Sequence, residues 1–390
     1  KNNFTADNTA NPTNSVNLKR QCASMEVLAE QLKADPTLGA RMQAIEDFTT
    51  DFVANKATNS NFRLVNGVIE IPVVVNVLYR TAAENISQAQ IQSQIDVLNE
   101  DYNAANADIS KVPSTFSALK ANYGIRFVLD QVIRKSTTKK SWSTNDAMKK
   151  STSGGINATS PTTKLNLWSC TLGGGILGYA QFPGGAAATD GVVILNSAFG
   201  RTGTVAAPYN KGRTATHEVG HWLNLRHIWG DATCGNDLVS DTPTAQTANY
   251  GCPSFPHYGS CSTTNPEMTM NYMDYTDDAC MYMLSAGQKT RLRAVLESGG
   301  ARASLQSSPG CLPPSGGSCG TPTGLAASAV TSSSATCSWT AVSGATNYSF
   351  EYKLSTASTW TVNTVTGTSF NLTGLTASST YNTRVKATGR

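Results

Sequence analysis

Charged side chains are scarce in this chain. Lys, Arg, Asp and Glu make up 14% of its 390 residues, against about 25% in a typical soluble domain. The formal net charge of +4 is spread over the whole length. The one basic stretch, 134–150, is interspersed with Ser and Thr and is typical of a solvated loop. We therefore expect no nucleic-acid partner.

Long hydrophobic runs are also missing. The longest strongly apolar stretch, Ile69 to Tyr79, is interrupted by Glu70, Pro72 and Asn76, and it is too short to cross a bilayer. We expect no transmembrane segment. The first four residues lack the apolar core of a signal peptide, so we expect that any such segment has been removed.

None of the nine cysteines forms a C-x-x-C pair, which argues against a zinc ribbon or a thioredoxin-like site. Dispersed cysteines in a chain rich in Ser, Thr, Asn and Gly are typical of disulfides made in an oxidising compartment. We therefore expect a secreted, extracellular protein. An odd number of cysteines leaves at least one thiol unpaired within the chain.

Apolar periodicity and composition divide the chain into segments. Helical spacing runs over 25–52, with a break near Pro36, and from Ile86 to Leu98 with a start near Ser87. Runs of β-branched residues predict strands over 69–79 and 125–133, and shorter strands are predicted at 165–168, 177–182 and 192–195. Residues 213–300 are predicted to form two helices around a long loop rich in Cys, Pro and Asp.

The C-terminal part is predicted to be a separate module. Residues 303–323 are rich in Ser, Gly and Pro, as in an interdomain linker. Short strands are then predicted at 335–339, 348–354, 360–365, 369–372 and 381–387, a spacing typical of a β-sandwich. Trp339, Gly374, Leu375 and Tyr381 resemble the fibronectin type III module, with Tyr381 in the tyrosine-corner position and Ala377 where that module usually has Pro. We expect a truncated module, and an unrelated small sandwich is the alternative.

The strongest chemical signal is the run from His217 to His221, H-E-V-G-H, followed by His227. Residues four apart lie on one face of a helix, so both imidazoles of the run can reach one metal ion. Glu218 sits beside that face, where it can take a proton from a metal-bound water. His227 cannot lie on the same straight helix, so the helix must end before it. Asn224 can provide that end, because Asn tolerates a left-handed backbone. Three of the four histidines fall in this motif, and core histidines on an ordinary helix are the alternative.

The extended motif, with Asn224 where Gly is usual, resembles the metzincin zinc peptidases, and Met268 to Tyr275 resembles their Met-turn. The resemblance implies that Met273 lies beneath the zinc as an apolar base. It also implies that Tyr275 is a tyrosine that swings toward the metal, with a packed surface tyrosine as the alternative. Residues 217–223 and 271–275 with a nearby Cys280 are similar to the pappalysin family, and that similarity covers about 20–300.

The family resemblance implies further features of the long loop. Its cysteines would pair as Cys234 with Cys261 and Cys252 with Cys280. A structural calcium would be held by Asp237, Asp241 and Thr242, with simple solvated acids as the alternative.

We expect an α+β protein with several segments. A pro-segment, 1–65, is inhibitory and helical over 23–53. It precedes a metzincin-like catalytic domain, 66–302, in which a twisted, mostly parallel sheet and helices form a zinc cleft. A linker, 303–320, and an all-β fibronectin type III-like sandwich, 321–390, follow.

The first functional hypothesis is a secreted zinc endopeptidase made as a latent zymogen. Zinc would be bound by His217, His221 and His227, and Glu218 would act as general base on the attacking water. The edge strand at 177–182 would pair with an extended protein or peptide substrate. The alternative is a catalytically passive adhesion or matrix-binding protein that uses its sandwich. The complete ligand set favours the enzyme. We expect a monomer, with weak surface or matrix contact through the sandwich.

Two finer hypotheses concern specificity and latency. Bacterial pappalysins prefer a basic residue after the cleaved bond, read by an Asp just before the last loop cysteine. Because Ala279 stands there, with Asp277 and Asp278 upstream, we expect a weaker preference for Lys or Arg.

Cys22 can fill the open zinc position, which resembles the cysteine switch of metzincin proforms. A disulfide to Cys170 or to a C-terminal cysteine is the alternative. Cleavage within 54–66, near Arg63, would release the thiol.

Overall fold

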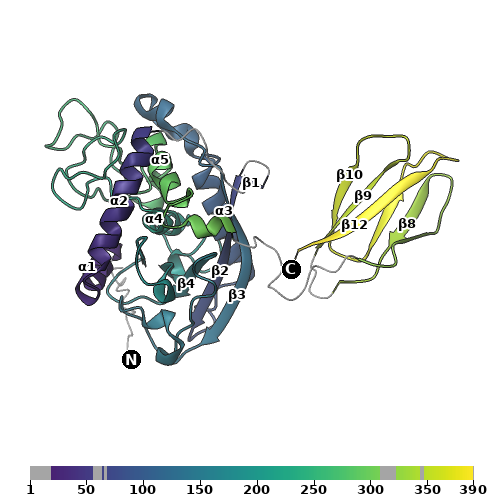
Figure 1. Cartoon of the computed structure of the whole chain (residues 1–390), viewed down its shortest axis with the longest axis horizontal. Helices are drawn as coiled ribbons and strands as arrows, with labels where there is room; N and C mark the ends of the chain where they lie inside the picture. Colours follow the sequence, from purple (N-terminus) through teal and green to yellow (C-terminus); the bar gives the residue numbers. More distant parts are fainter. Residues whose placement is uncertain (1–18, 56–63, 66–67, 308–321, 343–346, 390) are drawn as a thin grey trace, which may run out of the picture. The chain divides into compact units, whose positions relative to one another are not determined.

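The computed structural model describes residues 19–55, 64–65, 68–307, 322–342 and 347–389. The chain divides into two units, 1–308 and 309–390, which are drawn in Figure 1. The expected cleavage site near Arg63 and the cysteines at 311 and 319 lie outside the described residues. Within the described ranges, helices that combine the length and the apolar character of a membrane span are absent.

A six-stranded sheet organises the first unit. Its strands are β1 (Leu64–Val65), β2 (Val68–Tyr79), β3 (Ile125–Ser136), β4 (Leu165–Cys170), β5 (Gly178–Ala180) and β6 (Val192–Leu195). The order is β1-β2-β4-β6-β5, with β3 also paired to β2. The β2–β3, β2–β4 and β4–β6 pairs are parallel, whereas β5 runs antiparallel to β6 at one edge. The predicted mostly parallel sheet is confirmed, and its antiparallel edge strand β5 faces the site described below.

Strand β2 and helix α3 form where their residue types predict them. Val73, Val74 and Val75 are fully buried, as expected for a parallel strand covered on both faces. Helix α3 (Gln88–Tyr102) begins where predicted, because the Ser87 hydroxyl accepts a hydrogen bond from the Gln90 backbone N–H.

Two N-terminal helices, α1 (Ser24–Ala34) and α2 (Leu38–Asn55), flank the predicted break at Pro36. They are the purple helices in Figure 1, where α2 runs beside α5 (Ala286–Leu296). Glu46 of α2 forms a two-pronged ion pair with Arg291 of α5, at 2.5 and 2.7 Å. The N-terminal segment is therefore packed onto helix α5 of the same unit.

The long loop between α4 (Arg213–Trp222) and α5 has one short helix of its own, η7 (Asp278–Cys280). It is closed by disulfides between Cys234 and Cys261 and between Cys252 and Cys280, which confirms the implied pairing. Each crosslink closes a loop of fewer than 30 residues. By lowering the conformational entropy of the unfolded chain, it stabilises the fold by about 3 to 4 kcal/mol. Cys22, Cys170 and Cys337 are buried and free, so the disulfide alternative for Cys22 is wrong.

Two expectations for connecting segments need correction. Residues Ala303–Ser307, expected at the start of the linker, form the short helix η8, and Leu305 packs into the main core. The basic stretch 134–150, expected as a solvated loop, continues β3 to Ser136 and contains the short helix η3 (Ala147–Lys149). Lys149 is buried there and pairs with Asp146, because a lysine stem can be covered where its ammonium has a carboxylate partner.

The remaining short helices are η1 (Ile109–Lys111), η2 (Ser114–Leu119), η4 (Ser151–Ser153), η5 (Ala187–Thr189) and η6 (Asn196–Ala198).

The second unit has two three-stranded sheets, ordered β10-β9-β12 and β11-β8-β7. The strands are β7 (Ala326–Ser328), β8 (Ser334–Ser338), β9 (Asn347–Leu354), β10 (Thr361–Val365), β11 (Ser369–Thr373) and β12 (Tyr381–Gly389). The ring of Trp339 stacks on Phe350 with centroids 5.5 Å apart. The Tyr381 hydroxyl accepts a hydrogen bond from the Thr376 N–H at 3.1 Å. The predicted all-β module is confirmed, with β7 as a strand that sequence reasoning missed.

Candidate active site

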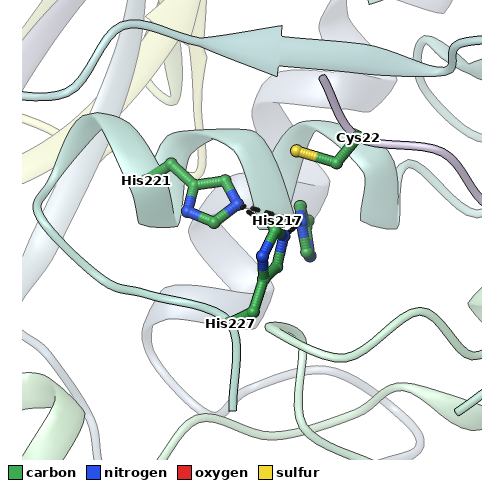
Figure 2. Close-up of side chains that lie close together, drawn as sticks. All are labelled: Cys22, His217, His221 and His227. Carbon is green, nitrogen blue, oxygen red and sulfur yellow. Dashed lines mark hydrogen bonds between the residues drawn. The ribbon is translucent and has the colours of Figure 1, made fainter. Parts of the chain in front are cut away.

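Helix α4 carries two of the three predicted metal ligands on one face. His217 and His221 are fully buried, and their ring centroids lie 4.8 Å apart. The helix ends at Trp222, and Asn224 adopts a left-handed backbone with φ of 72°. The chain then turns back so that His227 faces the same point, as Figure 2 shows. The predicted end of the helix at Asn224 is confirmed.

The three imidazoles converge through one nitrogen each. The Nε2 atoms of His217, His221 and His227 lie 3.0 to 3.2 Å from one another. Each Nδ1 atom has a separate acceptor: the carbonyl oxygens of Tyr272 and Leu225 and the carboxylate of Asp231. With Nδ1–H donating to these acceptors, the three Nε2 lone pairs point at a common centre.

The electrostatics of this centre suit a cation. Burial and the neighbouring histidines lower the pKa of His217 well below its usual value, and they lower the pKa of His221 to about 3. The imidazoles of His217 and His221 are therefore neutral, which is the form that binds metal. Tetrahedral zinc with Zn–N bonds of about 2.0–2.1 Å places its nitrogens about 3.4 Å apart, close to the observed spacing. The residues present fit zinc.

Glu218 lies on α4 against the edge strand β5. A Cβ atom on Gly178 would lie 2.8 Å from the Val193 carbonyl oxygen and 3.0 Å from Cγ of Glu218, so only glycine lets helix and strand approach this closely. Burial raises the pKa of Glu218 to about 7. A carboxylate with that pKa can both accept and release a proton near neutral pH.

The N-terminal segment occupies the open edge of β5. The Leu177 N–H donates to the Gln21 carbonyl at 2.9 Å, and the Ala23 N–H donates to the Gly178 carbonyl at 3.0 Å. These bonds align Cys22 parallel to Gly178. The Cys22 sulfur points at the histidines in Figure 2, and it lies within 4.8 Å of all three ligating nitrogens.

Ser24 is a site residue that sequence reasoning missed. Its hydroxyl donates to Glu218 at 2.9 Å and accepts from the Ala180 N–H at 2.8 Å. The Cys22 sulfur also approaches the same Glu218 oxygen, at 3.3 Å. The general-base candidate is thus engaged by two side chains of the N-terminal segment. No motif in the sequence marked this serine.

Arg20 is a buried charged residue of the same N-terminal segment. Its guanidinium pairs with Asp278 at 2.5 Å, donates to the Thr276 carbonyl at 3.2 Å, and lies over the Tyr209 ring. Asp278 also accepts the Lys211 backbone N–H at 2.7 Å. Although Ala279 lacks a carboxylate, the neighbouring Asp278 presents one to the basic side chain of Arg20.

The Met-turn and Tyr275 lie close to the histidines. Met273 is fully buried, and its sulfur would lie 2.4 Å from a Cβ atom on Gly220, so the turn passes directly against α4. The Tyr275 hydroxyl donates to the Cys22 carbonyl at 3.2 Å. Its ring centroid lies 5.0 Å from that of His227. Tyr275 is therefore at the site, where it contacts the N-terminal segment.

The three residues expected at a calcium site divide into two groups. Thr242 donates to Asp237 at 2.7 Å, and burial raises the pKa of Asp237 to about 6. Asp241 instead accepts from the Ser285 hydroxyl at 2.6 Å and the Gly287 N–H at 2.7 Å at the start of α5. Asp241 therefore stabilises the N-terminus of α5. It makes separate hydrogen bonds from those of the Asp237–Thr242 pair.

A buried three-histidine centre beside the glutamate of an H-E-x-x-H helix, set over a Met-turn, defines a metzincin zinc metalloendopeptidase. Comparisons with known proteins specify the family. The peptidase M43 model, described as pregnancy-associated plasma protein-A, matches residues 171–297, and the fibronectin type III model matches 320–390. The chain belongs to the pappalysin family of zinc metalloendopeptidases.

Several relatives are similar over most of their length. Extracellular metalloprotease 1 of Coccidioides posadasii is 33% identical, and the match covers 62% of this chain and 82% of the relative. Mature mirolysin of Tannerella forsythia, solved with a cleaved peptide, is 48% identical with a TM-score of 0.60, covering 61% of this chain and 96% of that one. A promirolysin mutant from the same organism is 43% identical with a TM-score of 0.66, covering 74% and 97%.

Asn224 offers a test of the turn that ends α4. Alanine at φ of 72° is strained, so Asn224→Ala should lower the free energy of unfolding by about 1 kcal/mol more than Asn224→Gly does. Chemical denaturation of both variants measures the difference. Equal or greater stability of the alanine variant would show that the turn imposes no backbone strain.

Proposed function

We propose that this chain is the latent proform of a secreted endopeptidase that cleaves extracellular proteins, with Glu218 as general base. The observation that carries the proposal is the position of Glu218, buried between the histidine centre and the edge strand β5. Zinc bound by the imidazoles supplies a Lewis acid that acidifies water and polarises a peptide carbonyl. Glu218 takes a proton from the attacking water and passes it to the leaving amine.

The edge strand supports the way in which the substrate is held. Leu177, Gly178 and Ala180 each present a main-chain group that is now satisfied by residues 21–24. When that segment leaves, the same groups can pair with an extended peptide. The Tyr275 hydroxyl also loses its Cys22 acceptor, and it can then donate to the oxygen that becomes negative during attack.

Replacing the general base tests this function directly. Glu218→Gln should lower kcat/KM of the processed enzyme by about 10²- to 10⁴-fold while its zinc content stays the same, because glutamine keeps the shape of the side chain but cannot accept the proton. Peptide hydrolysis and metal analysis measure the two quantities. Parent enzyme that carries zinc yet cleaves neither casein nor gelatin would favour the adhesion alternative.

Latency is proposed to depend on residues 1–65. The Cys22 sulfur lies within 4.8 Å of the three ligating nitrogens, which supports it as a fourth ligand, and binding as a thiolate would release its proton. Without metal, burial followed by the charge of Glu218 raises the pKa of this thiol well above its usual value. The likeness to promirolysin covers a larger share of this chain than the likeness to mature mirolysin does, which supports the assignment of a pro-segment. Cleavage within 54–66 is proposed to release it.

The latency proposal predicts the behaviour of Cys22→Ser. Its proform should be active or should process itself faster than the parent, because a hydroxyl binds zinc much more weakly than a thiolate. Cys170→Ala is the matched control, since Cys170 is also buried and free but lies in β4. Time courses on denaturing gels follow the processing. A Cys22→Ser proform that stays as latent as the parent contradicts the cysteine switch.

Specificity is proposed to depend on Asp278. Because its carboxylate pairs with the buried guanidinium of Arg20, we propose that in the processed enzyme it binds a Lys or Arg side chain next to the cleaved bond. The weaker basic preference expected from Ala279 is the alternative.

Asp278→Asn should therefore lower kcat/KM for peptides with Lys or Arg at that position, by about 10-fold for each 1.4 kcal/mol of lost interaction. Peptides with an apolar residue there should be affected much less. Asp277→Asn is the control, because it removes the adjacent carboxylate that makes no such ion pair with Arg20. Digests of a peptide library compare the variants. An unchanged ratio of basic to apolar cleavage in Asp278→Asn would contradict the assignment.

A structural calcium and secretion complete the proposal. Asp237 and Thr242 offer buried oxygen atoms of the kind that calcium prefers. The carboxylate of Asp241 instead accepts hydrogen bonds at the start of α5. Two disulfides and relatives named extracellular metalloproteases support secretion. A monomeric state and contact through the C-terminal module stay predictions.

A further inference from the structure

We infer that Asp231 is a positioning residue for the third zinc ligand: its carboxylate holds His227 in the tautomer and orientation that present Nε2 to the metal. This inference rests on the zinc site of the proposed function. It concerns the affinity of that site for the metal, because Asp231 contacts the metal ligand His227.

The acceptors of the three ligating histidines differ in charge. Nδ1 of His227 lies 2.5 Å from a carboxylate oxygen of Asp231. The corresponding atoms of His217 and His221 face neutral main-chain carbonyls, at 2.7 and 2.9 Å. Among these three ligands His227 is thus the one with a charged partner, and a charge-assisted hydrogen bond is about twice as strong as a neutral one.

The location of His227 explains why it needs such a partner. His217 and His221 are fixed by the α4 backbone, whereas His227 lies on an irregular turn that follows the helix. Trp229 stacks on its ring at 4.3 Å with an interplanar angle of 6°, and Tyr275 meets the ring edge-on. These contacts restrict the plane of the imidazole but supply no acceptor, so they cannot select the tautomer. Asp231 supplies that acceptor.

The turn is built to return the carboxylate to its own histidine. Gly230 and Asp231 both adopt left-handed backbones, with φ of 59° and 57°. A Cβ atom on Gly230 would lie 2.3 Å from the Asn236 nitrogen, so glycine is required there. Asp is one of the few other residues that tolerate this conformation. The Asp231 side chain remains 23% exposed, which leaves water access to its second oxygen.

The inference is tested on the full chain with Asp231→Ala and Asp231→Asn. Carboxylate partners of metal-bound histidines typically contribute about 10- to 100-fold in metal affinity, and we expect a loss of that size for the alanine variant. We expect a smaller loss for asparagine, whose amide oxygen still accepts from Nδ1–H but carries no charge. Asp130→Asn is the matched control, because it removes a carboxylate of β3 that pairs with Lys164.

Zinc dissociation constants come from competition with a chromogenic chelator, and circular dichroism of the metal-free proteins verifies the fold. Excess zinc should restore kcat/KM of the processed alanine variant, a rescue that lost folding would not allow. If alanine prevents folding, the asparagine variant decides. Unchanged zinc affinity in a folded Asp231 variant overturns the inference. Parent protein that binds zinc but cleaves no peptide would instead overturn the proposed function and leave the affinity comparison intact.

Discussion

The active site depends on where one helix ends. His217 and His221 share a face of α4, but a third imidazole can meet them only if the chain leaves the helix axis within a few residues. The left-handed Asn224 makes that turn, and its carbonyl is held by Arg291 of α5 at 2.9 Å. The Met-turn packs against the same helix at Gly220. The end of α4 therefore determines the geometry of the histidines, the packing of the helix and the path of the long loop.

The N-terminal segment contacts this site through its backbone and through several different side chains. Its backbone satisfies the edge of β5, and the Ser24 hydroxyl donates to Glu218. The Cys22 sulfur approaches the three histidine nitrogens, and Arg20 pairs with the buried carboxylate of Asp278. These contacts come from five consecutive residues, 20–24, so their effects on stability are coupled rather than additive. The distant Glu46–Arg291 ion pair anchors the following helices.

Local patterns in the sequence predicted what local physics determines. The valine run of β2, the Ser87 cap of α3 and the histidine spacing of α4 each depend on neighbouring residues, and family resemblance added the disulfide pairing. The roles of Ser24, Asp231 and Asp278 could not be read in this way, because each arises from a partner that only the folded chain brings near. Residues 303–307 were misassigned for the same reason: a Ser-rich composition indicates a linker, but burial of Leu305 in the core overrides it.

The open edge of β5 carries a liability of its own. A strand that can pair with any extended peptide can also pair with another copy of the protein, and unpaired sheet edges are common starting points for aggregation. Residues 21–24 cover this edge in the folded chain. The same few hydrogen bonds that occupy the proposed substrate-pairing edge therefore also leave that edge unavailable to another copy of the protein.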